Sequence, residues 1–208
     1  MIEASDVMEL FPSCLWLHKV SDSSKINEGL MRAVEEMRAA GEGNTRSSGK
    51  VWMSPTNLLE YDAFLPLSEF IIPAADQALG FMRYKFDHFY ISECWANMNG
   101  TGEIHPRHSH PNCFLSGVYY VQTSKGCGDI VFHDPRAQAA VLSPQFEEIT
   151  PQNSDRHYLQ PDEGMLIMFP SWLEHSVAEN KSGADRLSIS FNIMLTGTIG
   201  YESAQVTI

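Results

Sequence analysis

The stretch of sequence that decides the fold lies near the end of the chain, where residues 186–195 read Arg-Leu-Ser-Ile-Ser-Phe-Asn-Ile-Met-Leu. Its odd-numbered positions are all apolar, whereas positions 186, 188, 190 and 192 are polar. This alternation predicts a β-strand with one apolar and one polar face. The polar face either lies in water or, in a barrel whose outside is covered by helices, points inward to a ligand cavity.

The first 87 residues supply helices that would cover such a barrel. Apolar residues recur at helical spacing from Ile26 to Met37, which predicts a helix capped by Ser23 or Ser24 and ended by Gly41. A second helical stretch is predicted over residues 64–83.

Proline, glycine and polar residues mark where the predicted elements are interrupted. Pro73 either kinks the second helix or begins a new one, and the polar stretch 41–50 predicts a loop. After residue 88 the pattern changes to short β segments separated by Gly, Pro and Asn, at 88–98, 115–122, 129–133, 164–169, 175–178 and 186–195. We therefore expect a mainly β protein with N-terminal helices, folded as a helix-backed barrel or sandwich. The predicted single domain spans 1–208, with a helical support region (1–87), a β core (88–196) and a C-terminal tail (197–208).

The composition excludes several classes of function. Fourteen Lys and Arg residues against 26 Asp and Glu residues give a net charge of −12, which argues against nucleic-acid binding and against a polybasic membrane anchor. No apolar run approaches the ~20 residues of a membrane span. The four cysteines are scattered, without a Cys-x-x-Cys pair, which predicts reduced thiols and a cytoplasmic protein.

Three of the eight histidines lie within six positions, in the stretch Glu-Ile-His-Pro-Arg-His-Ser-His-Pro at residues 103–111. In an extended segment His108 and His110 project to the same side, so their ring nitrogens can share a cation. His175 begins a later predicted strand and is a candidate third ligand. This donor set suits iron, zinc or manganese, and the alternative is a group of surface histidines. His105 is left outside the ligand set, as a neighbour of the ligands or a surface residue.

Arg186 opens the polar face of the last predicted strand, and Ser188 follows two residues later. An arginine fork beside a hydroxyl is suited to bind a carboxylate in a bidentate way. In a barrel, the pair could reach the far end of a dicarboxylate whose near end binds the metal. The alternative for Arg186 alone is a surface ion pair.

Taken together, these features resemble the iron(II)- and 2-oxoglutarate-dependent dioxygenases, and most closely their prolyl-hydroxylase branch. Residues 99–102 (Asn-Gly-Thr-Gly), leading into 107–110, resemble that branch's approach to its His-x-Asp motif. Residues 118–122 (Val-Tyr-Tyr-Val-Gln) resemble its next strand, which carries a tyrosine that bonds 2-oxoglutarate. The segments 115–120, 134–136 and 169–175 are similar to a bacterial and phage group of 2-oxoglutarate/iron oxygenases of unassigned substrate. The resemblance covers about residues 88–196.

The resemblance implies a double-stranded β-helix, or jelly-roll, core and an oxygenase that decarboxylates 2-oxoglutarate to succinate while it oxidises an unknown substrate. It implies Fe(II) as the metal and 2-oxoglutarate as cosubstrate, and it admits ascorbate as a reductant. The implied metal ligands are His108, His110 and His175, and the implied 2-oxoglutarate residues are Tyr120, Arg186 and Ser188. The aromatic residues that would line the substrate side, or simply fill the core, are Trp95, Phe169 and Trp172.

One position departs from the family's pattern, because the usual second ligand is Asp or Glu and this chain has His110 there. Three hypotheses follow. Iron is held by three neutral imidazoles and 2-oxoglutarate balances its charge, or a carboxylate such as Asp134 completes the site, or the site has lost oxygenase chemistry and only binds metal.

Two further classes of protein remain open at this point. A cupin-like protein or three-histidine metal enzyme that does not use 2-oxoglutarate explains His-x-His, but not the paired tyrosines or the late Arg-x-Ser. A non-catalytic jelly-roll binding module explains the aromatic residues, but makes three converging histidines a coincidence. For partners we expect a small-molecule or peptide substrate, no nucleic acid and no membrane, with a homodimer as a further option.

Overall fold

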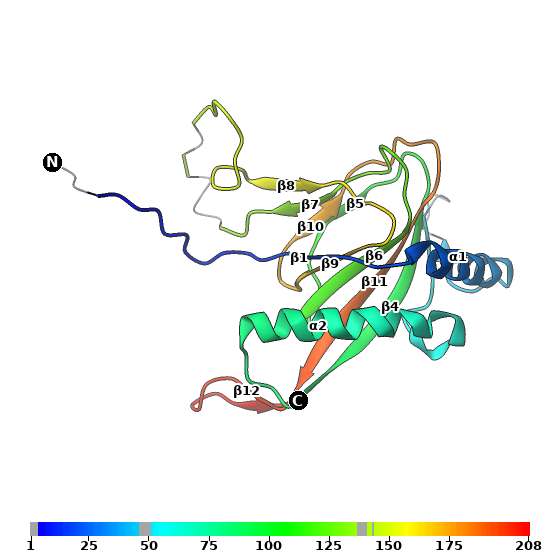
Figure 1. Ribbon diagram of the computed structural model, residues 1–208, viewed down its shortest axis with the longest axis horizontal. Coiled ribbons are helices and arrows are strands. Elements are labelled where there is room, and N and C mark those ends of the chain that lie inside the picture. Colours follow the sequence, from blue (N-terminus) through cyan, green and yellow to red (C-terminus); the bar gives the residue numbers. More distant parts are fainter. Residues whose placement is uncertain (1–3, 46–50, 137–140, 143) are drawn as a thin grey trace.

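The computed structural model of the protein describes residues 4–45, 51–136, 141–142 and 144–208, and it contains two antiparallel sheets that face each other (Figure 1). The major sheet has the strand order β1-β9-β6-β11-β4-β3-β2, and the minor sheet has the order β5-β10-β7-β8. This pair of sheets confirms the predicted jelly-roll fold class. The strands of the major sheet are β1 (Trp16–Lys19), β2 (Asn44–Thr45), β3 (Val51–Met53), β4 (His88–Asn99), β6 (Leu115–Gln122), β9 (Met165–Pro170) and β11 (Arg186–Thr196). Those of the minor sheet are β5 (His105–His108), β7 (Ile130–His133), β8 (Arg156–Leu159) and β10 (His175–Val177), and a separate hairpin is formed by β12 (Thr198–Ile199) and β13 (Val206–Thr207).

Two helices, α1 (Ser23–Ala39) and α2 (Ser68–Met82), cover the outer face of the major sheet (Figure 1). Two 3-10 turns, η1 (Leu58–Glu60) and η2 (Asp62–Leu67), lead into α2. The apolar face of each helix packs in one core with the odd-numbered residues of β11 and with side chains of β6 and β9. Of the two alternatives for the alternating residues 186–195, the structure shows the inward-facing one. The apolar face of the strand packs against the helices, and the even-numbered side chains point to the space between the sheets.

Helix α1 is fixed to the sheet by polar contacts as well as by apolar packing. The Asn27 side chain donates a hydrogen bond to the Val121 carbonyl (2.8 Å) and accepts one from the Tyr119 hydroxyl (2.6 Å). Asn27 and Tyr119 are both buried, so each polar group is satisfied inside the core. This three-residue contact sets the position of α1 against β6.

A smaller apolar cluster lies between the two sheets. It contains Val118 and Tyr120 of β6, Ile167 and Phe169 of β9, and Ile130, Phe132 and Leu173 from the minor-sheet side. These side chains fill one part of the space between the sheets and leave a cavity beside them.

The six predicted strands appear as β4, β6, β7, β9, β10 and β11, and each ends within one residue of its expected bounds. The predictions missed the short strands, chiefly β1, β3, β5 and β8. These strands have only three or four residues each, and pairing with a longer neighbour, which no local pattern encodes, determines them.

Three local predictions are corrected by the structure. The residue before α1 is Asp22, which has φ 52° and makes no side-chain capping bond, so neither Ser23 nor Ser24 is the cap. Pro73 does not begin a new helix, since α2 runs through it from Ser68. The predicted loop at 41–50 contains β2, which pairs with β3, while residues 46–50 lie outside the described residues. That the whole chain forms a single domain stays a prediction.

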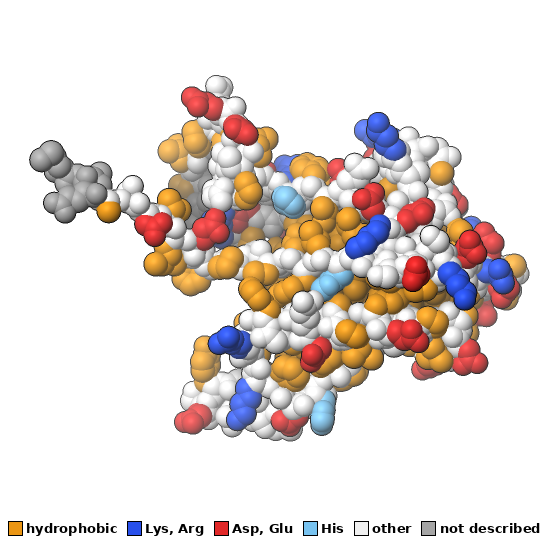
Figure 2. Space-filling view, viewed as in Figure 1, with side chains coloured by type: hydrophobic (Ala, Val, Ile, Leu, Met, Phe, Trp, Pro, Cys, Tyr) orange, Lys and Arg blue, Asp and Glu red, His pale blue; other side chains and the backbone are white. Residues whose placement is uncertain are grey.

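Acidic side chains are spread over the face of the molecule shown in Figure 2, and several of them lie over α1. No helix within the described ranges combines the length and the apolarity that crossing a membrane requires.

Candidate metal centre

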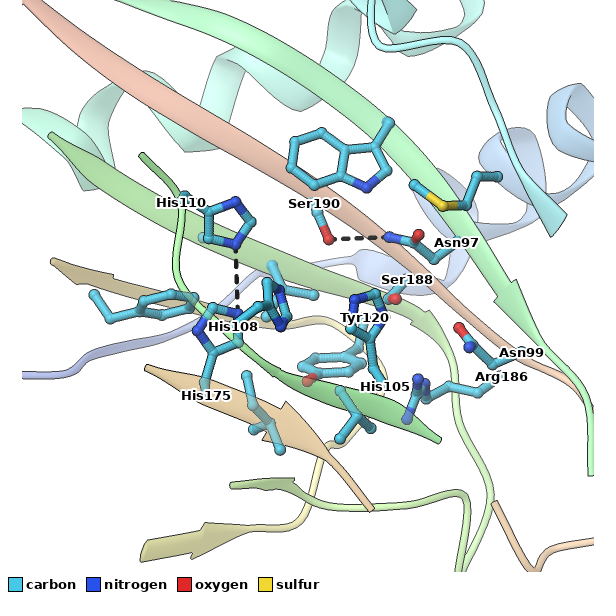
Figure 3. Close-up of a pocket in the computed structure, with 17 residues that line it drawn as sticks. Asn97, Asn99, His105, His108, His110, Tyr120, His175, Arg186, Ser188 and Ser190 are labelled. Carbon is cyan, nitrogen blue, oxygen red and sulfur yellow. Dashed lines mark hydrogen bonds between the residues drawn. The ribbon is translucent and has the colours of Figure 1, made fainter. Parts of the chain in front are cut away.

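His108, His110 and His175 converge between the two sheets at one end of the cavity (Figure 3). His108 ends β5, His110 follows two residues later, just before a turn at 111–112, and His175 begins β10 directly opposite His108 in the register. One ring nitrogen from each histidine lies within 4.8 Å of the others. The pairing of β5 with β10 is thus what brings the distant His175 to the His-x-His pair.

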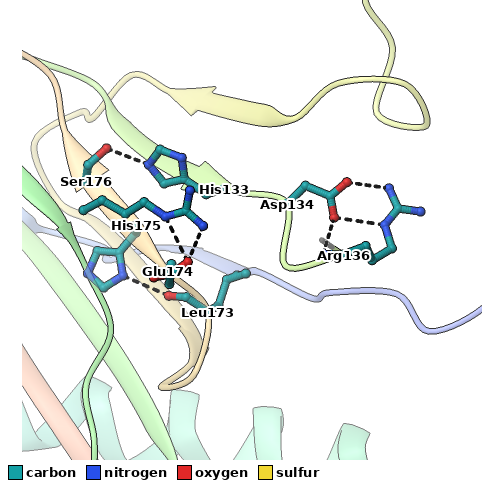
Figure 4. A network of polar contacts seen from close by, with 8 residues as sticks. His133, Asp134, Arg136, Leu173, Glu174, His175 and Ser176 are labelled. Atoms are coloured by element: carbon teal, nitrogen blue, oxygen red, sulfur yellow. Dashed lines mark hydrogen bonds and ion pairs between the residues drawn. The ribbon is translucent and has the colours of Figure 1, made fainter. Parts of the chain in front are cut away.

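Two of the three rings are held by backbone carbonyls, which fixes the nitrogen that remains for a metal. His108 Nδ1 lies 2.9 Å from the Pro106 carbonyl oxygen, and His175 Nδ1 lies 3.1 Å from that of Leu173 (Figure 4 shows the latter). A carbonyl only accepts hydrogen bonds, so each Nδ1 carries the proton and each Nε2 keeps its lone pair. His110 Nε2 lies 3.4 Å from His175 Nε2, so these two atoms face the same point. Such outer contacts are how proteins orient histidine ligands.

The surroundings favour the neutral form of two of the rings, those of His110 and His175. Burial lowers the pKa of His175 to about 3, with the neighbouring histidines acting in the same direction. Burial, followed by the charge of His108, lowers the pKa of His110 to about 4, although Glu93 opposes this shift. Neutral imidazole is the form that binds a metal, so the geometry and the electrostatics agree.

No carboxylate joins this cluster among the described residues. Asp134 is held elsewhere by Arg136, whose backbone and guanidinium groups donate to its oxygens at 2.9 Å (Figure 4). The hydrogen bond from Arg136 is the main cause that lowers the pKa of Asp134. The structure therefore does not support Asp134 as the third ligand. His105 lies close by, with its ring centroid 4.5 Å from that of His108, and it lines the same cavity.

The cavity between the sheets has a volume of about 180 Å³, and its wall has a polar part and an apolar part. Arg186, Ser188 and Ser190 line it from β11, and Tyr120 lines it from β6 (Figure 3). The structure thus brings all three residues of the predicted 2-oxoglutarate set, Tyr120, Arg186 and Ser188, to the cavity that holds the histidines. Burial raises the pKa of Tyr120, so its hydroxyl keeps its proton and can donate.

Arg186 lies at the opposite end of the cavity from His110 (Figure 3) and is 4% exposed. Its Nη1 donates to the carbonyl oxygens of Cys127 (3.1 Å) and Gly128 (3.2 Å), while its buried Nε has no partner in the described part of the chain. Gly128 has φ 93°, and a Cβ there would lie 2.2 Å from the Ala178 carbonyl oxygen, so only glycine lets this loop approach. A buried guanidinium with an unused donor is well suited to bind an anion.

Besides the polar side chains of β11 and β6, the cavity is lined by polar side chains of β4, which the sequence analysis did not predict. Asn97 and Asn99 line the cavity opposite Ser188 and Arg186. The period-two polar positions in 88–98 could have indicated them. Of the three aromatic residues expected at the substrate side, Trp95 and Phe169 line the cavity, whereas Trp172 is 56% exposed and is not part of its wall.

The minor sheet carries a further polar network outside the cavity (Figure 4). His133 Nε2 lies 2.9 Å from the Ser176 hydroxyl, and Arg107 pairs with Glu174 next to His175. These contacts join β7 to β10 and β5 to the residue before β10, and so support the strand that carries His175.

Comparisons with known proteins agree with this geometry. A protein family described as "Putative 2OG-Fe(II) oxygenase" matches residues 93–192, whereas no curated protein sequence matches the chain. A prolyl-4-hydroxylase from Pseudomonas putida has a similar structure, with a TM-score of 0.65, 15% identity and coverage of 89% of this chain and 94% of that one.

Two further solved structures are similar. The alpha-ketoglutarate-dependent epimerase SnoN of nogalamycin biosynthesis has a TM-score of 0.66 and 12% identity, over 88% of this chain and 76% of that one. HygX from Streptomyces hygroscopicus, with nickel and 2-oxoglutarate bound, has a TM-score of 0.60 and 12% identity, over 88% and 83%. The family match spans both strands that carry histidines and most of β11, the strand that carries Arg186. The chain therefore has a prolyl-hydroxylase-like jelly-roll fold, and over residues 93–192 its core is similar to the family of 2OG-Fe(II) oxygenases.

Proposed function

We propose that the protein is an iron(II)- and 2-oxoglutarate-dependent oxygenase whose metal is bound by three neutral imidazoles, those of His108, His110 and His175. The observation that carries this proposal is the placement of three converging ring nitrogens at one end of a cavity whose other end holds a buried arginine. Solved relatives that bind Fe3+ with alpha ketoglutarate, or nickel with 2-oxoglutarate, support the choice of cofactors.

The residues present fit both groups. The Nε2 atoms of His108 and His175 make none of the backbone contacts that hold the rings, so they are available to a metal. Three neutral imidazoles bring no charge to a divalent ion, so the dianion 2-oxoglutarate would balance it. The unused Nε of Arg186 and the hydroxyls of Tyr120 and Ser188 are suited to the distal carboxylate of that dianion.

When bound, iron(II) supplies the oxygen activation that couples decarboxylation of 2-oxoglutarate to oxidation of a substrate C–H bond. The chain's own residues hold the reactants. Arg186 would hold the distal carboxylate of the cosubstrate with its guanidinium group, while Trp95 and Phe169 would shield the reacting end of the cavity from water. Ascorbate would serve only to return oxidised iron to the ferrous state.

The direct test is oxygen- and iron-dependent formation of succinate from 2-oxoglutarate by protein reconstituted with Fe(II) under anaerobic conditions. Arg186→Lys keeps the charge but loses the fork, so we expect its KM for 2-oxoglutarate to rise at least about tenfold. His157→Ala alters an exposed histidine of β8 and should leave the rate unchanged. A lack of succinate above a metal-free control, with or without added candidate substrates, would contradict the proposal.

Calorimetry separates the remaining classes of protein. Binding of 2-oxoglutarate that requires Mn(II) supports the oxygenase. Metal binding without 2-oxoglutarate binding would indicate a three-histidine metal enzyme of another kind. Of the two alternative classes, the all-histidine donor set favours that metal enzyme over the non-catalytic binding module.

We infer further that the protein is cytoplasmic and acts on a small molecule or a peptide rather than a nucleic acid. Its four free cysteines support the location, and the charge of −12 supports the choice of partner. A homodimer through an exposed strand edge is part of the same proposal, and analytical ultracentrifugation tests it.

A further inference from the structure

The inner face of the major sheet is ordered in rows, because β11 and β4 pair in register. Three rows line the cavity: Arg186 opposite Asn99, Ser188 opposite Asn97, and Ser190 opposite Trp95. The fourth row on this face is Asn192 opposite Glu93. Arg186 therefore marks one end of the face, at the far end of the cavity from His110 (Figure 3). Glu93 marks the other end, where its charge acts on His110.

Glu93 is an exposed carboxylate held in place by a buried hydrogen-bond chain. Asn192 Nδ2 donates to Glu93 Oε2 at 2.7 Å, while Asn192 Oδ1 accepts from the Ser116 hydroxyl at 2.8 Å. The Ser116 hydroxyl also lies 2.9 Å from that of Ser171. Asn192, Ser116 and Ser171 are each at most 2% exposed, so the orientation of the Asn192 amide, and with it the carboxylate, is fixed.

The same chain is joined to the metal ligands. The backbone N–H of His110 donates to the Ser171 carbonyl oxygen at 2.9 Å, so the loop that carries the ligand and the chain that holds Glu93 share a residue. Glu93 makes no ion pair with a basic side chain in the described ranges. Its charge therefore has no counter-ion among the described residues.

A second, independent feature lies two rows further in. Asn97 is 8% exposed and donates through Nδ2 to the Ser190 hydroxyl at 3.1 Å (Figure 3). Its Oδ1 is buried in the cavity wall without any donor among the described residues. A buried acceptor left unpaired costs about 1–3 kcal/mol, so this oxygen is suited to an N–H or O–H group of a ligand.

Trp95 stands between these two acceptors on the same strand face. It lines the cavity, and its ring centroid lies 5.9 Å from that of His110. Same-face residues of a strand are about 6.8 Å apart, so Glu93, Trp95 and Asn97 form a stripe about 13 Å long that passes the histidines. The stripe offers a carboxylate, an aromatic face and an amide oxygen. These groups suit a cation or a hydrogen-bond donor and do not suit an anion.

We propose that this stripe recognises the substrate, and that the substrate carries a guanidinium or ammonium group which pairs with Glu93 against the face of Trp95, with a second N–H donor bound by Asn97. The inference rests on the proposed function, because it places the oxidisable carbon of the substrate between the two anchors, beside the histidines. The two ends of the cavity then have complementary tasks. Arg186 receives the dianionic cosubstrate, and Glu93 receives the cationic substrate.

The test measures binding rather than turnover, so it does not depend on oxygenase activity. Protein loaded with Mn(II) and 2-oxoglutarate is titrated with butylguanidinium and with its neutral isostere N-butylurea. A second arm uses acetyl-Gly-Arg-Gly-amide and the matching citrulline peptide, which distinguishes a free small molecule from a side chain within a peptide. Paramagnetic broadening of the ligand's proton signals by Mn(II) reports whether the ligand binds beside the histidines.

We expect at least one of the two cations to bind at least tenfold more tightly than its neutral isostere, with broadened signals. Glu93→Gln should abolish this preference without changing the affinity for Mn(II) by more than about twofold. Asn97→Leu should weaken binding of the arginine peptide. Glu36→Gln, an exposed carboxylate on α1, is the matched control and should bind as the wild type does.

Three results would overturn the inference. These are equal affinities for charged and neutral ligands, no saturable binding of either cation to the loaded wild-type protein, or loss of Mn(II) from the Glu93→Gln protein with unchanged cation preference. Failure of 2-oxoglutarate to bind during loading would instead count against the proposed function. In that event the same titrations are read on the Mn(II) protein alone.

Discussion

At the scale of single residues, the most informative position of the candidate metal centre is His110, where the resemblance described in the sequence analysis leads us to expect Asp or Glu. The other two imidazoles have carbonyl partners on Nδ1, whereas the ring of His110 lies against Trp95 and His175. A histidine in place of a carboxylate removes one negative charge from the candidate metal centre and leaves a half-buried ring whose pKa is lowered, so that it is neutral. The affinity of the site for metal should therefore depend on this residue in a predictable way.

We expect His110→Asp to retain Mn(II) at least as tightly as the wild type, because it adds an anionic oxygen ligand. His110→Ala should weaken Mn(II) binding by at least about tenfold, since it leaves two ligands. Equilibrium dialysis with detection of Mn(II) by electron paramagnetic resonance measures both. If His110→Ala bound Mn(II) like the wild type, His110 would not be a ligand.

At the scale of elements, strand β6 is confined on both of its faces. Tyr119 meets α1 and Tyr120 meets the cavity, while β9 and β11 pair along its two edges. Gly117 belongs to this strand for a steric reason, because a Cβ there would lie 2.3 Å from the ring of Phe191 and 2.9 Å from the Ile167 carbonyl oxygen.

Gly117→Ala should consequently lower the free energy of unfolding by about 1–3 kcal/mol, as overpacking in a core does. Gly29→Ala is the matched control, because nothing lies within 4 Å of its added methyl group on the exposed side of α1. That change should stabilise the protein by about 0.5–1 kcal/mol. Urea denaturation measures the pair, and a neutral effect of Gly117→Ala would show that the Phe191 ring moves aside at no cost.

The contact between α1 and β6 should make the stability of the protein depend on pH in the alkaline range. Burial raises the pKa of Tyr119 to about 12, whereas a tyrosine in an unfolded chain ionises near its ordinary value of about 10. The unfolded state therefore loses its proton first, so stability is complete below about pH 10 and falls as the pH rises towards 12.

Tyr119→Phe should lower stability at pH 8, because Asn27 loses its donor, yet it should lose less additional stability between pH 8 and 11 than the wild type. Part of the alkaline loss should remain, since burial shifts the pKa of Tyr120 in the same direction. Denaturation midpoints at the two pH values provide the comparison. An identical alkaline loss in the two proteins would exclude Tyr119 as its source.

The sequence predicted these elements where a local pattern determines the structure. The alternation from Arg186 to Leu195 encodes a strand directly, and the resemblance to a known family placed its polar face beside His108 and His110. Asn97 escaped notice because its role arises only when β4 pairs with β11. The cap of α1 was mistaken because Asp22 adopts a left-handed conformation that its sequence neighbours do not signal. The contact of Asp134 with Arg136, two residues away, was likewise invisible until the loop was seen.

At the scale of the whole molecule, the site is divided between two sheets. The minor sheet and the turn after β5 bring the histidines, and the major sheet brings Arg186, Ser188 and Tyr120. A metal and a dianion bound together would therefore connect parts of the chain that are far apart in sequence, and binding should stabilise the native state as a unit.

Mn(II) and 2-oxoglutarate at about 100 times their dissociation constants should add about 2.7 kcal/mol each to the free energy of unfolding. For a chain of this size, each kcal/mol raises Tm by about 2–4 °C. Differential scanning calorimetry should show the increase in the wild type but not in His175→Ala. An equal increase in that variant would place the binding elsewhere.

The apolar cluster between the sheets has a consequence of a different kind, since it sets the distance across which the site is built. Ile167 and Phe132 belong to this cluster, which separates β6 and β9 from the minor sheet, and Ile167 is fully buried. Removing one methyl group there, as in Ile167→Val, should cost only about 0.5–1.5 kcal/mol of stability. Because a displacement of about 1 Å can reduce a rate a hundredfold, succinate formation should fall more than stability does. These side chains act as spacers, and evolution could tune the reach between metal and arginine through them without changing any residue that binds a ligand.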